Sequence, residues 1–301
     1  MNHKKAIILM NMGAARSPEE LRLFIRNMFS DKRIIPYKIR HLLAPLIARF
    51  RYKKVWKNYR EIGGSPLYDI SRLLADQLQN YCQQEVICAM RYTRPYLNEV
   101  IHRYKSVRIV PLYPHYSTTS FESVLDAVKE TGFQGEINIT QAFYLHSAYN
   151  QIIVKRIISS IDNPKEWHLL FSAHGLPQKT VDKGDVYPQQ IETQVNILKK
   201  HLPDFKSIDY AYQSRVGFMP WIRPYLDEKL KEYKGKNLLI YPISFVIDNS
   251  ETKYELEIEY RKKAIETGIK RYQVVDCPND SDNFVRFLKD LACPENKKNR
   301  N

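Results

Sequence analysis

A histidine in the second half of the chain has the residue type and the position that proton transfer requires. His174 follows a strand-like apolar run, residues 168–172, and precedes Gly175. This order predicts that its imidazole lies at the carboxyl edge of a sheet, where α/β proteins bind their ligands. With a reference pKa of about 6.5, an imidazole there can accept a proton near neutral pH. A turn histidine that bonds to the backbone is the alternative.

A second group of candidate residues is acidic. The stretch 248–251, Asp-Asn-Ser-Glu, contains residues that can cap a helix beginning near Glu251. From there Glu251, Glu255 and Glu259 recur every four residues, drifting about 40° per step on a regular α-helix. Glu259 has a lysine four residues further on, whereas Glu251 and Glu255 have none. If they face a cleft they attract a divalent cation or a proton, and a π-bulge would align them better. A solvated acidic face is the alternative.

Three residues of the first half are also expected at the carboxyl edge of a sheet. Arg91 and Tyr92 follow the strand-like run 85–90, and Tyr113 ends the next run. Arg91 can hold an anionic group with two parallel hydrogen bonds. The alternatives are a salt bridge within the domain for Arg91 and a place at the edge of the core for each tyrosine.

The elements that must position these residues alternate between strands and helices. With 301 residues the chain is long enough for two domains, and 44% hydrophobic residues exclude a disordered chain. The alternation predicts βαβ units and an α/β fold with parallel sheets. Ser17, Pro18 and Glu20 predict a capped helix start. The predicted strands cover residues 6–11, 85–90, 107–112, 137–140, 168–172, 208–212, 237–241 and 273–275.

A weak internal repeat relates the two halves of the chain. AIILMNMGAA (6–15) and HLLFSAHGLP (168–177) each show a strand that runs into a glycine-containing turn. VPLYPHYSTTSFESVL (110–125) and YPISFVIDNSETKYEL (241–256) each show a strand, a proline, an irregular stretch and a serine-rich helix start. The repeat predicts two similar α/β halves whose irregular segments border a shared cleft.

Several classes of protein are excluded or disfavoured. The chain has no P-loop, GxGxxG, GxSxG or HExxH motif. Its apolar runs are shorter than the about 20 residues that cross a bilayer, and its start does not read as a signal peptide. The cysteines show no CxxC spacing, so neither a zinc ribbon nor a disulfide framework is indicated. We therefore expect a cytoplasmic protein, with peripheral membrane association as a further option. The cysteines are Cys82, Cys88, Cys277 and Cys293.

A basic arm, residues 32–60, holds ten Lys or Arg and no Asp or Glu, interleaved with large apolar side chains. Such an arm can meet nucleic acid, anionic lipid or an acidic small molecule. Its aliphatic content favours a partner whose surface has an apolar side over the phosphate backbone of a nucleic acid. A helix packed on its own domain with a solvated basic face is the alternative.

Taken together, these segments resemble the ferrochelatase family, which inserts ferrous iron into a porphyrin to complete haem. The resemblance covers almost the whole chain, and FSAHGLP and QSRVG are its most specific parts. The matching segments are NMG (11–13), FSDKRII (29–35), IGGSPL (62–67), MRY (90–92), PLYPHYSTT (111–119), FSAHGLP (171–177), VDKGDVYP (181–188), YQSRVGFMPWIRPYLD (212–227), FVIDNSET (245–252) and ELEIEYR (255–261).

The resemblance implies a chelatase-like α/β fold with two Rossmann-like domains, parallel sheets, a pseudo-twofold relation and the porphyrin in the cleft between them. We expect an N-terminal domain over residues 1–145 and a second domain over 146–281, with the option that a C-terminal helix over 282–291 crosses back to complete the first domain. The basic arm corresponds to the family's lip over the pocket mouth, which suits docking on a membrane surface.

The resemblance also implies roles for individual residues. His174 is expected to be the catalytic proton acceptor and Glu251 its catalytic partner. Asp248 and Glu255 continue the acidic side, so these four residues are the expected contacts of the incoming metal. The expected porphyrin contacts are Met12, Arg91, Tyr92, Tyr113 and Trp221.

The implied reaction is that of a lyase that needs no cofactor. Fe²⁺ is a substrate, and the porphyrin, protoporphyrin IX or coproporphyrin III, gives up two N–H protons as the metal enters. A tight apolar cleft is expected to bend the ring and expose its nitrogens. Basic residues would steer propionates and the acidic stripe would steer iron.

Two departures from the family pattern bear on this hypothesis. Many relatives have a histidine two residues before the catalytic glutamate, where this chain has Asn249. This motivates an alternative, a porphyrin or haem carrier without catalysis. Cys293 stands alone near the C-terminus, so no [2Fe-2S] cluster is expected. A nucleic-acid binder that uses the basic arm is a third, less favoured hypothesis, and no nucleic-acid partner is expected.

Overall fold

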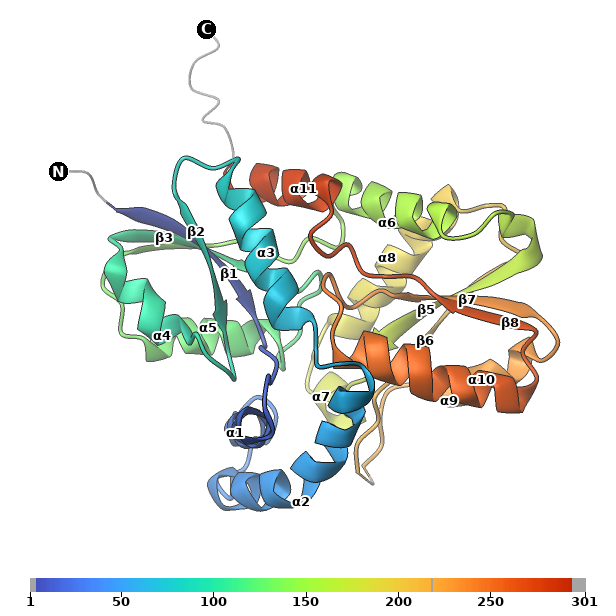
Figure 1. The fold of residues 1–301 in the computed structure, drawn as a ribbon, viewed down its shortest axis with the longest axis horizontal. Coiled ribbons are helices and arrows are strands. Elements are labelled where there is room, and N and C mark those ends of the chain that lie inside the picture. The colour runs from blue at the N-terminus through green and yellow to red at the C-terminus, as the bar shows by residue number, and fades with distance from the viewer. Residues whose placement is uncertain (1–3, 218, 294–301) are drawn as a thin grey trace, which may run out of the picture.

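Two four-stranded parallel sheets organise the chain (Figure 1). The computed structural model describes residues 4–217 and 219–293. All eight predicted strands are confirmed, each within two residues at either end. The first sheet consists of β1 (Lys5–Asn11), β2 (Glu85–Met90), β3 (Ser106–Pro111) and β4 (Glu136–Ile139). The second sheet consists of β5 (Trp167–His174), β6 (Ser207–Gln213), β7 (Asn237–Pro242) and β8 (Arg271–Val274).

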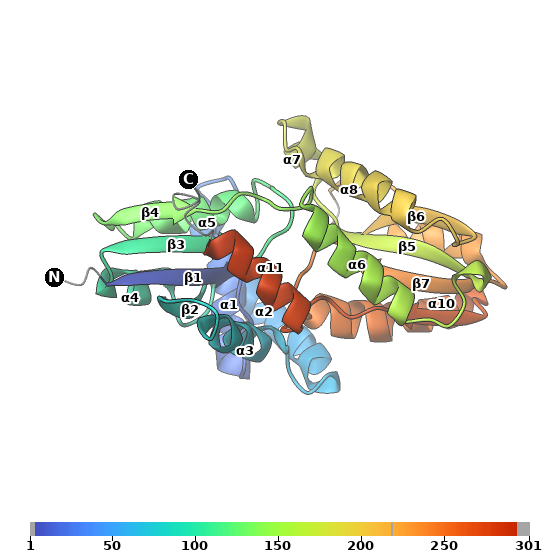
Figure 2. The same ribbon diagram turned by 90° about the horizontal axis from the view of Figure 1, so that it is seen from above.

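The two sheets have the same topology. The spatial order is β2-β1-β3-β4 in the first and β6-β5-β7-β8 in the second, and every neighbouring pair is parallel. Counted within each half, both orders are 2-1-3-4, so the internal repeat is confirmed. The carboxyl ends of β1 and β5 point toward the middle of the molecule (Figure 2). In such sheets the ligand site lies where the strand order reverses, here beside β1 and β3 or beside β5 and β7.

Helices connect the strands and cover both faces of the sheets, so the central strands are almost entirely buried (Figure 1). The α-helices are α1 (Pro18–Ser30), α2 (Arg40–Glu61), α3 (Leu67–Gln79), α4 (Leu97–Val100), α5 (Phe121–Glu130), α6 (Ser147–Ser159), α7 (Gln178–Asp182), α8 (Tyr187–His201), α9 (Leu226–Lys229), α10 (Arg261–Thr267) and α11 (Asp282–Ala292). A π-helix spans Glu251–Tyr260, and 3₁₀ turns span Ile101–Arg103, Pro164–Glu166 and Leu230–Tyr233.

Helix α1 starts where its sequence predicts. The Ser17 hydroxyl accepts a hydrogen bond from the Glu20 backbone N–H at 3.1 Å, and Pro18 is the first helical residue. The Glu20 carboxylate accepts from the backbone N–H of Arg16 at 2.7 Å instead of that of Ser17. The reciprocal half of the capping box therefore lies one residue earlier than the pattern predicts.

The basic arm forms most of α2, which packs along α1 and ends beside the π-helix (Figure 1). One side of α2 is buried through Ala44, Ala48 and Tyr59. The opposite side leaves large apolar side chains in solvent: Leu42 is 72% exposed and Phe50 is 76% exposed. The arm therefore packs on its own half, as one alternative predicted, and also leaves apolar side chains exposed; its contact with an external partner stays a prediction. Among the described residues, no helix has the length and apolar character needed to cross a bilayer.

A buried aspartate joins the two halves. Asp185, between α7 and α8, is 2% exposed. Its Oδ2 atom accepts hydrogen bonds from the Ser117 hydroxyl at 3.0 Å and from the Thr118 backbone N–H at 2.8 Å, both in the loop after β3. Its Oδ1 atom accepts from the Tyr187 backbone N–H at 3.0 Å. One carboxylate thus holds the loop after β3 against the start of α8.

The C-terminal helix also connects the halves. The apolar face of α11 shares one core cluster with α3 and α6, and the helix lies across the junction in both views (Figure 1, Figure 2). Polar contacts fasten its amino end: Gln77 Nε2 donates to Asp280 at 3.1 Å and the Tyr81 hydroxyl donates to Asp282 at 3.0 Å. The predicted domain limits near residues 145 and 281 stay predictions.

Replacement of Asp185 by alanine is expected to destabilise the protein by about 2–3 kcal/mol, because buried donors on Ser117 and Thr118 lose a charged acceptor. The free energy of unfolding in urea measures this. Asp182→Ala, at an exposed position in α7, is the matched control and should change it by less than about 0.5 kcal/mol. Equal effects of the two substitutions would contradict a role for Asp185 in joining the halves.

Candidate functional site

His174 and Glu251 form a close pair at the carboxyl edge of the second sheet. The His174 Nδ1 atom lies 2.7 Å from the Glu251 Oε2 atom. His174 is the last residue of β5 and Glu251 begins the π-helix that follows β7, and these two strands are neighbours in the sheet. The pair therefore forms because the sheet order places two strand ends side by side, although 77 residues separate the partners.

A serine that the sequence analysis did not single out connects this pair to Glu255. Ser214 directly follows β6, the other neighbour of β5. Its Oγ atom lies 2.9 Å from Glu251 Oε2 and 2.6 Å from Glu255 Oε2, and its backbone N–H donates to Glu255 Oε1 at 2.9 Å. Its backbone is left-handed, with φ of 68°, a conformation that costs a non-glycine residue energy and clusters at functional sites. The motif QSRVG was the available signal, because it contains Ser214.

The charges of this group follow from burial and proximity. Burial lowers the pKa of His174, but the Glu251 carboxylate outweighs burial and the pKa is raised. Burial raises the pKa of Glu251, and the imidazolium reverses this, so the pKa is lowered. Burial, and then repulsion from Glu251, raise the pKa of Glu255 to about 7. Near neutral pH the group therefore holds an ionised Glu251 between two groups that can carry a proton.

The proton on Glu255 also explains the contacts of the serine. A serine hydroxyl has one proton and two acceptor lone pairs. When Glu255 is protonated it can donate to Ser214 Oγ while Ser214 donates to Glu251, so both short contacts are satisfied at once. His174, Glu251, Ser214 and Glu255 then form one continuous hydrogen-bonded chain.

Gly175 brings Trp221 next to the histidine. A Cβ atom at position 175 would lie 2.7 Å from the Gln213 carbonyl oxygen and 3.3 Å from the Trp221 ring, so a larger residue would push the turn off β6. Trp221 is half-buried, and its indole N–H donates to the Val216 carbonyl at 3.1 Å. The structure therefore places Trp221 beside the turn that carries His174.

Asp248, the other acidic candidate of this segment, bonds to residues outside the group of His174, Glu251 and Glu255. Asp248 is 2% exposed and accepts from Asn279 Nδ2 at 2.7 Å, with Lys253 Nζ at 3.8 Å. Asn249 is also buried, and its Oδ1 atom accepts from the Glu251 backbone N–H at 2.7 Å. Asp248 and Asn249 thus fix the start of the π-helix, and they form no hydrogen bond with His174.

Arg91 and Tyr92 belong to a polar network inside the first half. The Arg91 guanidinium pairs with Glu130 at 2.7 Å and with Asp31 at 3.3 Å, and its Nε donates to Ser123 at 2.9 Å. The buried Tyr92 hydroxyl donates to Asp31 at 3.0 Å. This is the salt bridge within the domain that the sequence analysis gave as the alternative. Contact of either residue with a porphyrin stays a prediction.

The remaining two candidates follow the central strands of the first sheet. Met12, directly after β1, is partly buried against two core clusters, and its carbonyl accepts from the Tyr92 backbone N–H at 3.0 Å. Tyr113, after β3, is partly buried, and burial raises its pKa. Both lie at the carboxyl edge of the first sheet, as His174 lies at the carboxyl edge of the second.

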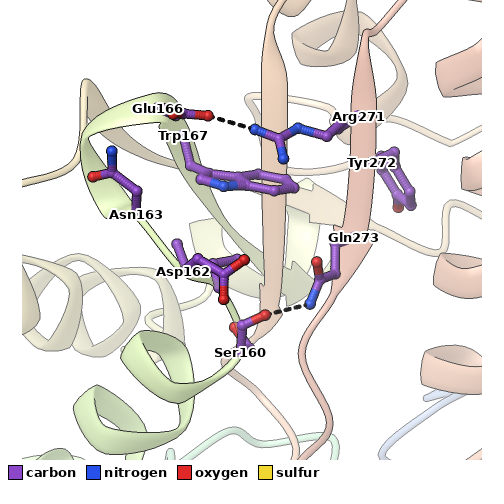
Figure 3. A pocket seen from close by; sticks show the side chains of 9 residues that line it. Ser160, Asp162, Asn163, Glu166, Trp167, Arg271, Tyr272 and Gln273 are labelled. Atoms are coloured by element: carbon purple, nitrogen blue, oxygen red, sulfur yellow. Dashed lines mark hydrogen bonds and ion pairs between the residues drawn. The ribbon is translucent and has the colours of Figure 1, made fainter.

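Two hollows lie away from this group. One of about 560 Å³ lies at the amino ends of β5 and β8 (Figure 3). The length of β5 separates it from His174. Three of its polar side chains are paired within the hollow: Arg271 bonds to Glu166 at 2.7 Å, and Gln273 donates to the Ser160 carbonyl at 2.7 Å. The other, of about 270 Å³, includes Arg91. Neither contains His174 or Glu251.

The described part of the chain holds no group of three or more His, Cys, Asp or Glu side chains arranged to bind a metal. His174, Glu251 and Glu255 are connected through Ser214, but Asp248 is turned away from them. The four expected metal contacts therefore do not form one closed ligand set.

Comparison with known proteins adds independent information. Residues 4–296 match the family model described as Ferrochelatase. A ferrochelatase of Nitratiruptor sp. is 44% identical over 304 residues, which cover 95% of this chain and 98% of that protein. A ferrochelatase of Helicobacter pylori strain J99 is 37% identical, over 96% of this chain and 92% of that protein. Among solved structures, SirB from Bacillus subtilis with Fe³⁺ has a TM-score of 0.57 at 10% identity, over 96% of each chain. That likeness supports the chelatase-like two-domain fold.

The His174 imidazole is expected to titrate above pH 6.5, and Glu251→Gln should lower its pKa, because burial is then opposed only by the weaker attraction of the Glu255 carboxylate. NMR of the histidine ring as a function of pH measures both values. Since folding raises this pKa, the pair stabilises the fold below about pH 6.5, and the contribution fades as the pH rises through the raised value. Glu259→Gln, on the exposed side, is the control. An unchanged titration in Glu251→Gln would show that the pair does not form.

Proposed function

The chain belongs to the ferrochelatase family, and from this premise we propose how its residues insert Fe²⁺ into a free-base porphyrin for haem synthesis. As a member it is a metal chelatase whose substrates are a porphyrin and iron. The observation that carries the detailed proposal is the 2.7 Å contact between His174 Nδ1 and Glu251 Oε2. The reaction is Fe²⁺ plus porphyrin to give haem and two protons, so a base must stand where the pyrrole N–H groups are presented.

His174 is the proton acceptor in this proposal. Its outward nitrogen, Nε2, is the atom that meets the pyrrole proton, because Nδ1 is held by Glu251. The neighbouring carboxylate stabilises the imidazolium that forms, as an orienting carboxylate does in general acid–base catalysis. A proton can then pass from the pair through Ser214 to Glu255, whose pKa of about 7 suits a group that takes up and releases protons near neutral pH. Two protons leave the porphyrin per turnover. Transfer of a proton through Ser214 to Glu255 returns His174 to the form that accepts the next one.

The same carboxylates attract the metal. Glu251 and Glu255 lie close together on either side of the Ser214 hydroxyl, and their negative charge favours the approach of Fe²⁺. For Asp248 the contacts with Asn279 and Lys253 favour a positioning role at the start of the π-helix. The apolar side chains of Met12, Tyr113 and Trp221 provide surface for a flat macrocycle, and the exposed lysines and arginines of the arm suit its propionates.

A carrier without catalysis was motivated by Asn249. In this chain the Asn249 side chain is occupied with the backbone of residues 247 and 251, so it supports the local helix start and leaves the proton chemistry to His174. A carrier would bind porphyrin tightly and never consume it in the presence of iron. The assay below separates the two functions.

An anaerobic assay with Fe²⁺ and each of protoporphyrin IX and coproporphyrin III tests the proposal. His174→Ala is expected to lower the rate of iron insertion by about 10²- to 10⁴-fold, the range typical for a lost general base. His168→Ala, at the opposite end of the same strand, is the matched control and should keep activity. Near-normal turnover by His174→Ala would overturn the role assigned to this residue. Porphyrin binding without turnover by the unaltered protein would favour the carrier.

The exposed apolar side of α2 is proposed to dock on an anionic membrane surface. Leu42 and Phe50 are three-quarters exposed, and exposed lysines and arginines share the helix. Leu42→Ser combined with Phe50→Ser should weaken binding to phosphatidylglycerol vesicles at least about tenfold. Ile265→Ser, 69% exposed on α10, is the control. Binding should also weaken at high salt. Unaltered co-sedimentation of the double variant would contradict this contact.

A further inference from the structure

Two cysteines far apart in the sequence meet where the C-terminal helix reaches α3. Cys82 lies just after α3 and Cys293 directly follows α11. Their sulfur atoms are 2.6 Å apart, although 211 residues separate them. Formation of a bond would need the two atoms to approach by only about half an ångström, since a disulfide bond is about 2.05 Å long. No other proximity of this kind joins two thiols among the described residues.

The surroundings favour a dithiol over a metal site. Within the described residues no third His, Cys, Asp or Glu joins Cys82 and Cys293 in a possible ligand group. The Gln84 side-chain amide lies 3.9 Å from the Cys293 sulfur, and the charge of Lys289 acts on Cys82. The other two cysteines, Cys88 and Cys277, belong to β2 and to the buried stretch after β8. They therefore serve as internal controls for any reaction of the pair.

The two thiols differ in access. Cys82 is 9% exposed, whereas Cys293 is half-buried and open to small reagents. Burial, and then the contact with Cys293, raise the pKa of Cys82 to about 12. Cys293 is consequently the sulfur that reacts first with a dissolved oxidant, and Cys82 is placed to react second. Because a thiol–disulfide exchange proceeds through a mixed disulfide, this division of roles suits the pair.

We propose that Cys82 and Cys293 are a reversible redox site whose disulfide fastens α11 covalently to α3. The oxidant is a low-molecular-weight disulfide, RSSR. The Cys293 thiolate attacks one of its sulfurs, the S–S bond of RSSR breaks, and one RS⁻ leaves. The Cys82 sulfur then attacks the Cys293 sulfur of the mixed disulfide and expels the second RS⁻. The two cysteines lose two electrons and two protons in total, and RSSR is reduced to two RSH.

The position of the pair determines what the bond would do. Noncovalent contacts already hold the amino end of α11 through Gln77 and Tyr81, whereas the pair lies at its carboxyl end. The bond would close a loop of more than 200 residues, and long loops give a disulfide its largest effect on the unfolded chain. Because α11 packs on both α3 and α6, the bond secures the helix that spans the two halves. The proposal is independent of the reaction at His174.

Incubation of the full-length protein with oxidised glutathione, then alkylation and peptide mass spectrometry, tests the proposal. The expected product is a peptide pair linked through Cys82 and Cys293, with Cys88 and Cys277 alkylated after unfolding. The melting temperature should rise by roughly 5–10 °C relative to the reduced protein, and dithiothreitol should reverse the rise.

Variants separate the steps. Cys82→Ser should stop at the mixed disulfide of Cys293 with glutathione and should lose the rise in melting temperature, whereas Cys88→Ser should keep both the link and the rise. Two results with the unaltered protein would overturn the proposal without any variant: a stable mixed disulfide on Cys293 with no link, or unreacted thiols at both positions after prolonged oxidation of the folded chain.

Discussion

The arrangement of this protein depends on one contact, the close pair of His174 and Glu251. Both side chains are partly exposed, and each shifts the pKa of the other: the carboxylate raises the pKa of His174, and the imidazolium lowers the pKa of Glu251. The pair needs β5 to lie between β6 and β7, because the turn after β6 supplies Ser214 and the helix after β7 supplies Glu251. The sheet order is thus the physical condition for the site.

Holding a second carboxylate, Glu255, next to this pair costs free energy. Ser214 adopts a left-handed backbone, worth about 1–3 kcal/mol of strain for such a residue, and by doing so it directs both its hydroxyl and its backbone N–H at the acidic helix. Repulsion between Glu251 and Glu255 is relieved when Glu255 takes a proton. The strained backbone of Ser214 and the raised pKa of Glu255 therefore both follow from the hydrogen-bonded chain that leads away from His174.

The sequence predicts the strands well because their information is local: β-rich runs and turn residues determine all eight. It also places His174 correctly at a strand end. The pairing of His174 with Glu251 was only implied by family resemblance, since 77 residues lie between them. For the same reason the sequence did not indicate Ser214, and it offered a salt bridge within the domain for Arg91 without identifying Asp31 as a partner. Contacts between distant segments depend on sheet order and loop path, which residue spacing does not encode.

The internal repeat shows how one fold serves two purposes. Met12 and Gly13 directly follow β1, and in the aligned repeat they correspond to His174, the last residue of β5, and to Gly175. Both glycines allow a close approach to the chain near the end of the neighbouring strand, to Thr93 in one half and to Gln213 in the other. In the aligned repeats Glu251 corresponds to Ser120. The first half therefore has a methionine and a serine where the second has an imidazole and a carboxylate. The same backbone turn carries a methionine in one half and an imidazole paired with a carboxylate in the other, and the proposed proton transfer from a flat apolar ring depends on this asymmetry.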